Sequence, residues 1–288
     1  MRAYRGIIHT RKTDKRRVDM SYRLIAVDMD GTLLDDSKKI TPRTAEAVRR
    51  ASAEGVTVCL STGRPLCGVR RYLDELALDT PVITCNGALI ADASSGEVLF
   101  SRCVEPQDAR AVWIYGQAFD TTICVWVRDR LYVNRIDERT EDYKKISGVE
   151  PEIIADFEAL IREGISKLLW YDTPENITVF REKLDTELNG GVSYLTSNPA
   201  FLEFFDSRVS KAKAMEFLGA HIGIAREEMI AVGDGENDLS MLEYAGLGVA
   251  MGNASEAVKS RCGHVTASNN DDGVAKVIER FCLGSRSD

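Results

Sequence analysis

Two aspartates separated by a single residue follow a short apolar run that ends at Val27. In a β-strand, residues i and i+2 point to the same side, so Asp28 and Asp30 can enter one crevice together. Gly31 then allows the chain to turn sharply. Two neighbouring carboxylates repel each other, so the pair suits a cation or an exchanging proton. The segment predicts a site at the carboxyl end of a buried strand, where open α/β sheets bind ligands, although Asp-x-Asp-Gly also occurs in calcium loops and plain turns.

A second acidic cluster follows another apolar run, in the segment Met-Ile-Ala-Val-Gly-Asp-Gly-Glu-Asn-Asp that begins at Met229. Asp234 is expected at the end of a strand, with Asn237 and Asp238 in the first turn of the next helix. The helix dipole alone favours one acid in that turn. It does not account for Gly-Asp-x-x-Asn-Asp after a second buried strand. We therefore predict that the two acidic clusters meet in one metal site.

Three further segments carry polar groups at positions where they could join this site. Ser61-Thr62-Gly63-Arg64 follows an expected strand, and a hydroxyl with backbone N–H groups at a helix start can bind an anion, although an ordinary helix cap fits as well. Arg64 could reach a phosphate or form a surface salt bridge. Asn86 ends the next expected strand and faces the same crevice, though a turn explains it almost equally. Lys211 begins a helix, where most lysines are solvated, as Lys213 is expected to be.

The order of these motifs resembles that of the haloacid dehalogenase superfamily. More narrowly, it is similar to the Cof-type sugar-phosphate phosphatases of subclass IIB, which carry a large cap. The resemblance runs from about Tyr22 to Phe281. It implies that Asp28 is a nucleophile that forms an aspartyl-phosphate. It also implies that Asp30 protonates the leaving group and then deprotonates the attacking water.

The resemblance extends to the remaining candidate residues and to the cofactor. It favours the hydroxyl of Thr62 over that of Ser61 and makes Lys211 a phosphate-binding lysine. The expected phosphate and substrate ligands are Thr62, Ser61, Gly63, Arg64, Asn86 and Lys211. The expected metal residues are Asp28, Asp30 (through its main-chain carbonyl), Asp234, Asn237 and Asp238, the last two acting through water or by holding Asp234. So few carboxylates suit Mg²⁺, which keeps several waters.

The element pattern predicts an α/β fold, a doubly wound Rossmann-like parallel sheet core with an inserted α+β cap domain. Strands at 24–27, 56–60 and 81–85 with intervening helices predict right-handed crossovers in one parallel sheet. A hairpin is expected over 88–100. The cap is assigned to 106–206, with helices at 107–119 and 174–188 and strands at 122–127, 131–134, 165–171, 192–196 and 201–205. Residues 21–105 and 207–288 are assigned to the catalytic core, and 1–20 to a disordered basic extension, with a binding tail as the alternative.

Composition excludes several function classes. The chain has 288 residues and a formal net charge of −8, which argues against non-specific nucleic-acid binding. No apolar run reaches the roughly 18–20 residues that span a bilayer. Seven dispersed cysteines are typical of reduced thiols in a cytoplasmic protein. Three unclustered histidines make a zinc site or Ser-His-Asp chemistry a poor fit.

The leading hypothesis is therefore a Mg²⁺-dependent phosphatase of small phosphate esters. A phosphomutase would share the aspartyl-phosphate chemistry, and a non-catalytic phospho-ligand-binding domain is the third possibility. The physiological substrate and the oligomeric state stay open. Three tryptophans in the expected cap are assigned to its core rather than to sugar-binding platforms: Trp113, Trp126 and Trp170.

Overall fold

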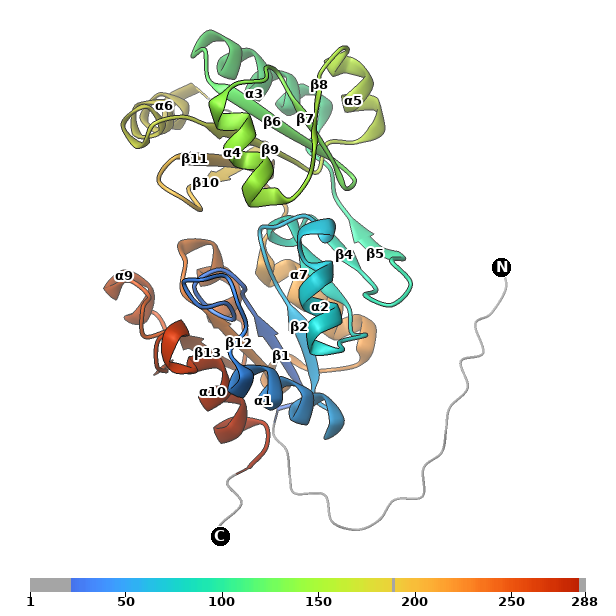
Figure 1. Cartoon of the computed structure of the whole chain (residues 1–288), viewed down its shortest axis with the longest axis vertical. Helices are drawn as coiled ribbons and strands as arrows, with labels where there is room; N and C mark the ends of the chain where they lie inside the picture. The colour runs from blue at the N-terminus through green and yellow to red at the C-terminus, as the bar shows by residue number, and fades with distance from the viewer. Residues whose placement is uncertain (1–21, 188–189, 285–288) are drawn as a thin grey trace.

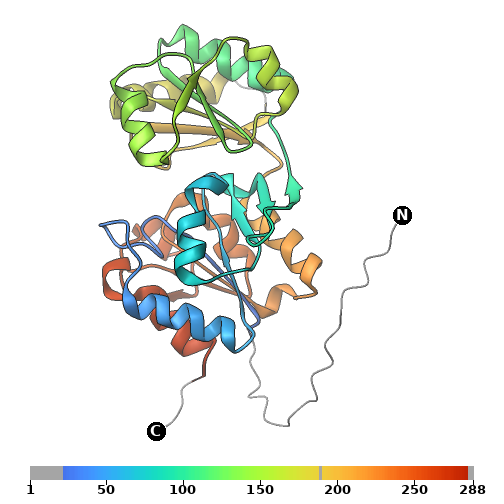
Figure 2. The same cartoon turned by 45° about the vertical axis from the view of Figure 1, so that its right-hand side comes forward.

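The structure is a computed structural model that describes residues 22–187 and 190–284. The predicted extension at 1–20 and the last residue of the predicted helix at 174–188 lie outside the described residues. Two lobes are joined by two crossings of the chain, and the elements from α3 to β11 form the upper lobe (Figure 1). The second view shows the same separation (Figure 2).

The lower lobe is built on a five-stranded sheet in the order β14-β13-β12-β1-β2, in which every neighbouring pair is parallel. The strands are β1 (Leu24–Val27), β2 (Thr57–Leu60), β12 (Met229–Gly233), β13 (Leu247–Ala250) and β14 (His264–Val265). The helices are α1 (Pro42–Ala53), α2 (Arg70–Leu76), α7 (Lys211–Ile222), α8 (Leu239–Tyr244), α9 (Glu256–Lys259) and α10 (Gly273–Phe281). β14 and α9 were not predicted, because they are only two and four residues long.

Alternation along β1 explains why helices cover both faces of this sheet. Ile25 and Val27 pack with residues of α1, α2 and α10, whereas Leu24 and Ala26 pack with residues of α7 and α8. A strand buried on both faces reads as a continuous apolar run, which is the pattern that predicted it. The helices also begin where the sequence indicates; for example, Thr41 caps α1 by accepting a hydrogen bond from the backbone N–H of Thr44.

The third expected parallel strand requires a correction. β3 (Val82–Thr84) pairs antiparallel with β4 (Leu89–Ala91), which pairs antiparallel with β5 (Val98–Ser101). A single parallel bridge between Ser61 and Ile83 joins this small sheet to the main one. The reason is the turn at 85–87, where three successive residues have positive φ and return the chain alongside β3. The hairpin expected over 88–100 is present as β4 and β5.

The upper lobe contains a six-stranded sheet in the order β10-β11-β9-β6-β7-β8, which is antiparallel except for the β7·β8 pair. Its strands are β6 (Thr122–Val127), β7 (Arg130–Val133), β8 (Pro151–Ile153), β9 (Lys167–Tyr171), β10 (Val192–Leu195) and β11 (Phe201–Asp206). Its helices are α3 (Pro106–Ala118), α4 (Glu138–Ser147), α5 (Phe157–Glu163) and α6 (Pro174–Glu187). β8 and α5 were not predicted, because each is short and lacks a clear periodic pattern.

The two faces of the upper sheet have different coverings. Residues of α3, α5 and α6 bury one face around Trp170, while Tyr143 of α4 packs on the other face with Trp126. Trp126 and Trp170 are fully buried, and Trp113 stacks on Phe157. All three tryptophans therefore belong to the packing of this lobe. The fold is α/β, with a doubly wound parallel core and an inserted α+β cap; its exact boundaries, 105/106 and 206/207, remain our proposal.

The two chain crossings between the lobes lie against each other. Arg208, just after β11, contacts Glu105, just before α3, and its guanidinium also holds Asp206. A small apolar cluster at the same place joins Phe205 and Val209 to residues at the end of β3. In the described part of the chain, no helix has the length and apolar character needed to cross a membrane.

Candidate active site

Asp28 lies at the carboxyl end of β1, where a buried lysine holds it. Its backbone N–H donates to the carbonyl of Val232 at 2.9 Å, continuing the parallel ladder beyond the strand. Lys211, the first residue of α7, is 1% exposed and donates from Nζ to Asp28 Oδ1 at 2.6 Å, to Asp238 Oδ1 at 2.6 Å and to the carbonyl of Ser61 at 2.9 Å. The ammonium group of Lys211 therefore links the two acidic clusters, which lie far apart in the sequence.

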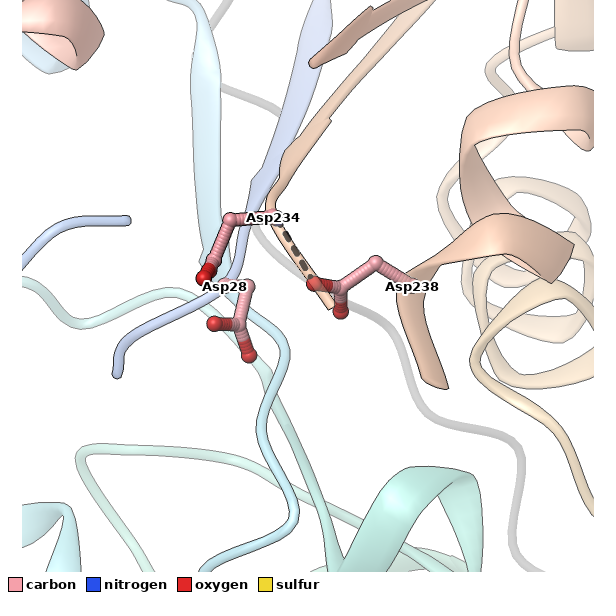
Figure 3. A group of neighbouring side chains, drawn as sticks. All are labelled: Asp28, Asp234 and Asp238. Carbon is pink, nitrogen blue, oxygen red and sulfur yellow. Dashed lines mark hydrogen bonds between the residues drawn. The ribbon is translucent and has the colours of Figure 1, made fainter. Parts of the chain in front are cut away.

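Asp234, directly after β12, and Asp238, in the short 3-10 helix Glu236–Asp238, both approach Asp28 (Figure 3). Asp238 Oδ2 accepts from the backbone N–H groups of Asp234 and Gly235, at 3.0 and 2.9 Å. Its Oδ1 is held by Lys211, so both oxygens of Asp238 already have partners. Thr32 donates to Asp234 Oδ1 at 2.7 Å. The geometry makes Asp238 a support for the loop and leaves Asp28 and Asp234 as the more available carboxylates.

Gly31 permits the close approach of the two acidic segments. Its φ is +82°, and a Cβ built there would lie 2.8 Å from Cγ of Asp234. An L side chain would be strained by the backbone and would also collide with the carboxylate. The glycine in the first motif therefore provides space for the second motif as well as a turn.

The carboxylates of Asp28, Asp234 and Asp238 carry more negative charge than Lys211 alone can offset. Burial raises the pKa of Asp28 well above its usual value, the Asp238 charge raises it further, and Lys211 offsets only part of the rise. Burial also raises the pKa of Asp234 to about 6, against the hydrogen bond from Thr32. Carboxylate oxygens of Asp28, Asp234 and Asp238 all lie within 4.8 Å of one another. Hard oxygen donors with unrelieved negative charge are a fitting environment for Mg²⁺.

Asp30 has a different environment from Asp28. Arg64 donates to both of its oxygens at 2.7 Å, and Lys38 Nζ lies 3.0 Å from Oδ1. Burial acts to raise the pKa of Asp30, but the hydrogen bonds and charges of Arg64 and Lys38 lower it to about 2. The two aspartates do share one crevice, as expected. However, β1 ends at Val27, and Asp30 stands in the following turn with its carboxylate directed to Arg64 rather than to the acidic cluster.

The loops after β2 and β3 bring the other expected ligands to differing positions. Thr62 lines the cavity, and its Oγ1 accepts from the backbone N–H of Arg64 at 3.2 Å. Ser61 contributes its carbonyl to Lys211, while its hydroxyl is buried without a hydrogen-bond partner and lies outside the cavity lining. Asn86 does not line the cavity; its side chain accepts from Asn237 Nδ2 at 3.2 Å. Asn237 is therefore directed toward this loop rather than toward the carboxylates.

A cavity of about 560 Å³ lies between the acidic cluster and the cap. Its core side includes Asp28, Asp30, Asp234 and the segment 62–65, and its cap side comes from α4, from β9 and from the β10–β11 region. The lining also contains side chains that the sequence did not single out, among them Lys38, Arg71, Tyr143, Lys145, Lys167, Ser197, Asn198, Phe201 and Glu203. Glu203 in Phe-Leu-Glu-Phe-Phe is the one that a sequence signal could have revealed, because a single charge interrupts an apolar strand.

The family model for haloacid dehalogenase-like hydrolases matches residues 25–278. The chain belongs to this family. YxeH of Bacillus subtilis (strain 168), provisionally named a phosphatase, is 36% identical over 277 residues, which are 91% of this chain and 99% of YxeH. YitU of the same organism, a 5-amino-6-(5-phospho-D-ribitylamino)uracil phosphatase, is 31% identical over 265 residues, 90% of this chain and 97% of YitU.

Solved structures agree with this assignment. A haloacid dehalogenase-like hydrolase from Bacteroides thetaiotaomicron superposes with a TM-score of 0.82 at 30% identity, over 90% of this chain and 99% of the other. A sugar phosphatase of haloacid dehalogenase subclass IIB gives a TM-score of 0.77 at 26% identity, over 90% of this chain and 98% of the other. The Cof-type resemblance inferred from the motifs is confirmed, and the protein is a phosphatase of this family.

Proposed function

We propose that the protein hydrolyses small phosphorylated metabolites, sugar phosphates or similar compounds, through an aspartyl-phosphate on Asp28 and with Mg²⁺ as cofactor. The observation that carries the proposal is the arrangement around Asp28. The buried carboxylate of Asp28 accepts a hydrogen bond from Lys211 and lies close to Asp234. It lines a cavity whose other side is formed by the cap. A cavity of about 560 Å³ is in the usual range for a small ligand and far too small for a folded protein substrate.

In the first step, an oxygen of Asp28 attacks phosphorus, a P–O bond forms, and the ester P–O bond breaks. The departing alkoxide takes a proton from Asp30. In the second step, water attacks the acyl phosphate, Asp30 accepts its proton, and inorganic phosphate leaves with the Asp28 carboxylate restored. Two displacements of moderate difficulty replace a single hard one.

Lys211 supports both steps by fixing one oxygen of Asp28 and by placing positive charge beside the incoming phosphate. Thr62 and the backbone N–H groups that follow it are suited to hold phosphate oxygens. Mg²⁺, held by Asp28, Asp234 and the Asp30 carbonyl, would orient the phosphate and offset the negative charge that develops during transfer. Asp238 and Asn237 would keep these groups in position.

Asp30 requires a proton before it can act as the acid, yet Arg64 and Lys38 hold it ionised in this structure. We infer that a bound phosphate competes for the guanidinium of Arg64. Loss of that partner would raise the pKa of Asp30 and allow it to carry the proton. Arg64 would thereby serve both as a substrate ligand and as the partner of the acid in the free enzyme.

The test is hydrolysis of a panel of phosphate esters by the full chain with Mg²⁺, compared with Asp28→Asn. We expect turnover to fall to less than about a thousandth, because loss of a covalent nucleophile costs several orders of magnitude. Asp36→Asn is the matched control, since Asp36 is exposed and lies outside the cavity lining. Transfer of phosphate back to a bisphosphorylated sugar, in place of release to water, would identify a phosphomutase instead.

A further inference from the structure

A lysine and a glutamate of the cap form a charge pair that is buried where cap and core meet. Lys167 begins β9 and Glu203 lies on the neighbouring strand β11, and they are 2% and 5% exposed. Lys167 Nζ lies 3.4 Å from Glu203 Oε1. Charged side chains are rarely buried this far unless each has partners. The groups that form hydrogen bonds with Lys167 and Glu203 therefore indicate the role of the pair.

The partners come from both lobes. Lys167 Nζ donates to the carbonyl of Gly63 at 2.9 Å, in the core loop that carries Thr62. Glu203 Oε2 accepts from Asn86 Nδ2 at 3.1 Å, and Oε1 accepts from the hydroxyl of Ser197, within the cap, at 2.8 Å. Lys167 and Glu203 therefore contact two loops of the core, and these loops contribute to the site or support it.

The contacts continue to the second acidic motif. Asn86 and its neighbour Cys85 both have positive φ, +54° and +49°, and Asn86 Oδ1 accepts from Asn237. A chain of hydrogen bonds therefore runs from Glu203 through Asn86 to Asn237, one residue before Asp238. Backbone that is held at positive φ needs surrounding contacts to keep it there. Glu203 supplies one of these contacts from the cap.

We propose that Lys167 and Glu203, which we call the latch pair, are positioning residues that complete the phosphate site when the cap docks. The inference rests on the proposed function, because it assigns these residues to the same site. With the cap docked, the latch pair fixes the carbonyl of Gly63 and the side chain of Asn86. With the cap away from the core, both charges would meet water and both core loops would lose a partner.

Removing one charge of the latch pair should have a different effect from removing both. Removing one partner of a buried pair leaves an unpaired charge in the interface, whereas replacing both with neutral groups of similar shape is often tolerated. Both residues of the latch pair also line the cavity, although both oxygens of Glu203 already accept hydrogen bonds from protein groups. A purely electrostatic role of the pair predicts that the combined variant recovers, whereas a positioning role predicts that it does not, because the donor to the carbonyl of Gly63 is lost.

The experiment compares Lys167→Met, Glu203→Gln and the combined variant, with p-nitrophenyl phosphate and Mg²⁺. Each single change should raise KM by roughly tenfold and alter kcat by less than about threefold, because apparent affinity falls with the population of the competent state. The combined variant leaves no unpaired charge but should keep a raised KM, because methionine cannot donate to the carbonyl of Gly63. Glu158→Gln is the control, since it breaks the exposed cap pair with Arg110 and should change neither constant.

Small-angle X-ray scattering supplies a readout that does not depend on catalysis. The radius of gyration should increase in the single variants and return toward the wild-type value in the combined variant. If wild-type protein hydrolyses no ester, the proposed function fails and scattering alone decides the latch. A combined variant with the wild-type KM, or single variants indistinguishable from the wild type in KM and size, would overturn the inference.

A milder change guards against loss of folding, which circular dichroism and thermal melting would detect. Ser197→Ala removes the hydroxyl that holds Glu203 Oε1 and leaves both charges in place. We expect KM to rise by about threefold with kcat nearly unchanged, because a weakened latch lowers the docked population only partly. An unchanged KM in this variant, with the single variants unfolded, would also overturn the inference.

Discussion

Replacing Lys211 with methionine should destabilise the fold as well as abolish activity. The side chain is 1% exposed and contacts Asp28 and Asp238 at 2.6 Å each. Methionine keeps most of the volume but leaves these carboxylates without their cation. Breaking a buried pair by removing one partner typically costs about 3–5 kcal/mol. At about 2–4 °C per kcal/mol for a protein of this size class, the melting temperature should fall by roughly 6–20 °C.

The loss should depend on pH in a defined direction. The pKa of Asp28 in the folded protein is already raised above its unfolded value, and removal of Lys211 would raise it further. A carboxyl with a raised folded-state pKa costs stability where it is ionised, and that cost disappears as falling pH protonates it. The difference between wild type and Lys211→Met should therefore be greatest near pH 8 and become smaller toward pH 5.

The assay is urea unfolding without divalent metal at pH 8 and pH 5, followed by the same measurement with Mg²⁺. Lys213→Met is the matched control, because Lys213 lies on the same helix but is exposed. Mg²⁺ should stabilise the Lys211→Met protein, since a bound cation relieves the same carboxylates. A loss below about 1 kcal/mol at pH 8, the value expected for an exposed pair, would refute the reasoning. So would an equal loss at both pH values.

Three further outcomes are expected. Chelation with EDTA should silence hydrolysis, and Mg²⁺ should restore it far better than Ca²⁺, which prefers more ligands at longer distances; full activity after chelation would exclude a metal site. In carboxyl ¹³C NMR titrations, the pKa of Asp30 should rise from about 2 in Arg64→Met and rise less in Lys38→Met, because Arg64 is its principal partner; an unchanged pKa would contradict that ion pair. Phe201→Ala and Asn198→Ala, on the cap side of the cavity, should change relative kcat/KM among phosphate esters more than they change p-nitrophenyl phosphate hydrolysis; equal losses on all esters would contradict selection of substrate by the cap.

The acidic half of the site could be predicted because its signals are local. Asp28 and Asp234 each end a buried apolar strand, and the carboxyl ends of parallel strands meet at one edge of the sheet. The contact of Lys211 with both clusters could not be derived from spacing; the family resemblance implied its place near the site. The helix start at Lys211 was visible, but the direction of its side chain depends on how α7 packs against the sheet.

Other features depend on contacts between distant segments that no local pattern encodes. The carboxylate of Asp30 turns toward Arg64 because β1 ends before it, so alternation no longer governs its direction. β3 meets the main sheet at a single parallel bridge, because the turn at 85–87 returns the chain into an antiparallel hairpin. Lys167 stands at the start of an apolar strand, where a charged residue is ordinary, and only the docked cap shows that it is buried.

The contact between the two chain segments that join the lobes affects how the cap can move. Arg208 of the returning segment pairs with Glu105 of the outgoing segment, and this half-exposed ion pair holds the two crossings side by side. A rotation of the cap would be absorbed at these two adjacent crossings, since a hinge uses a few residues between rigid bodies. Lys167 and Glu203 would return to the same two core loops without a search over alternative docking positions.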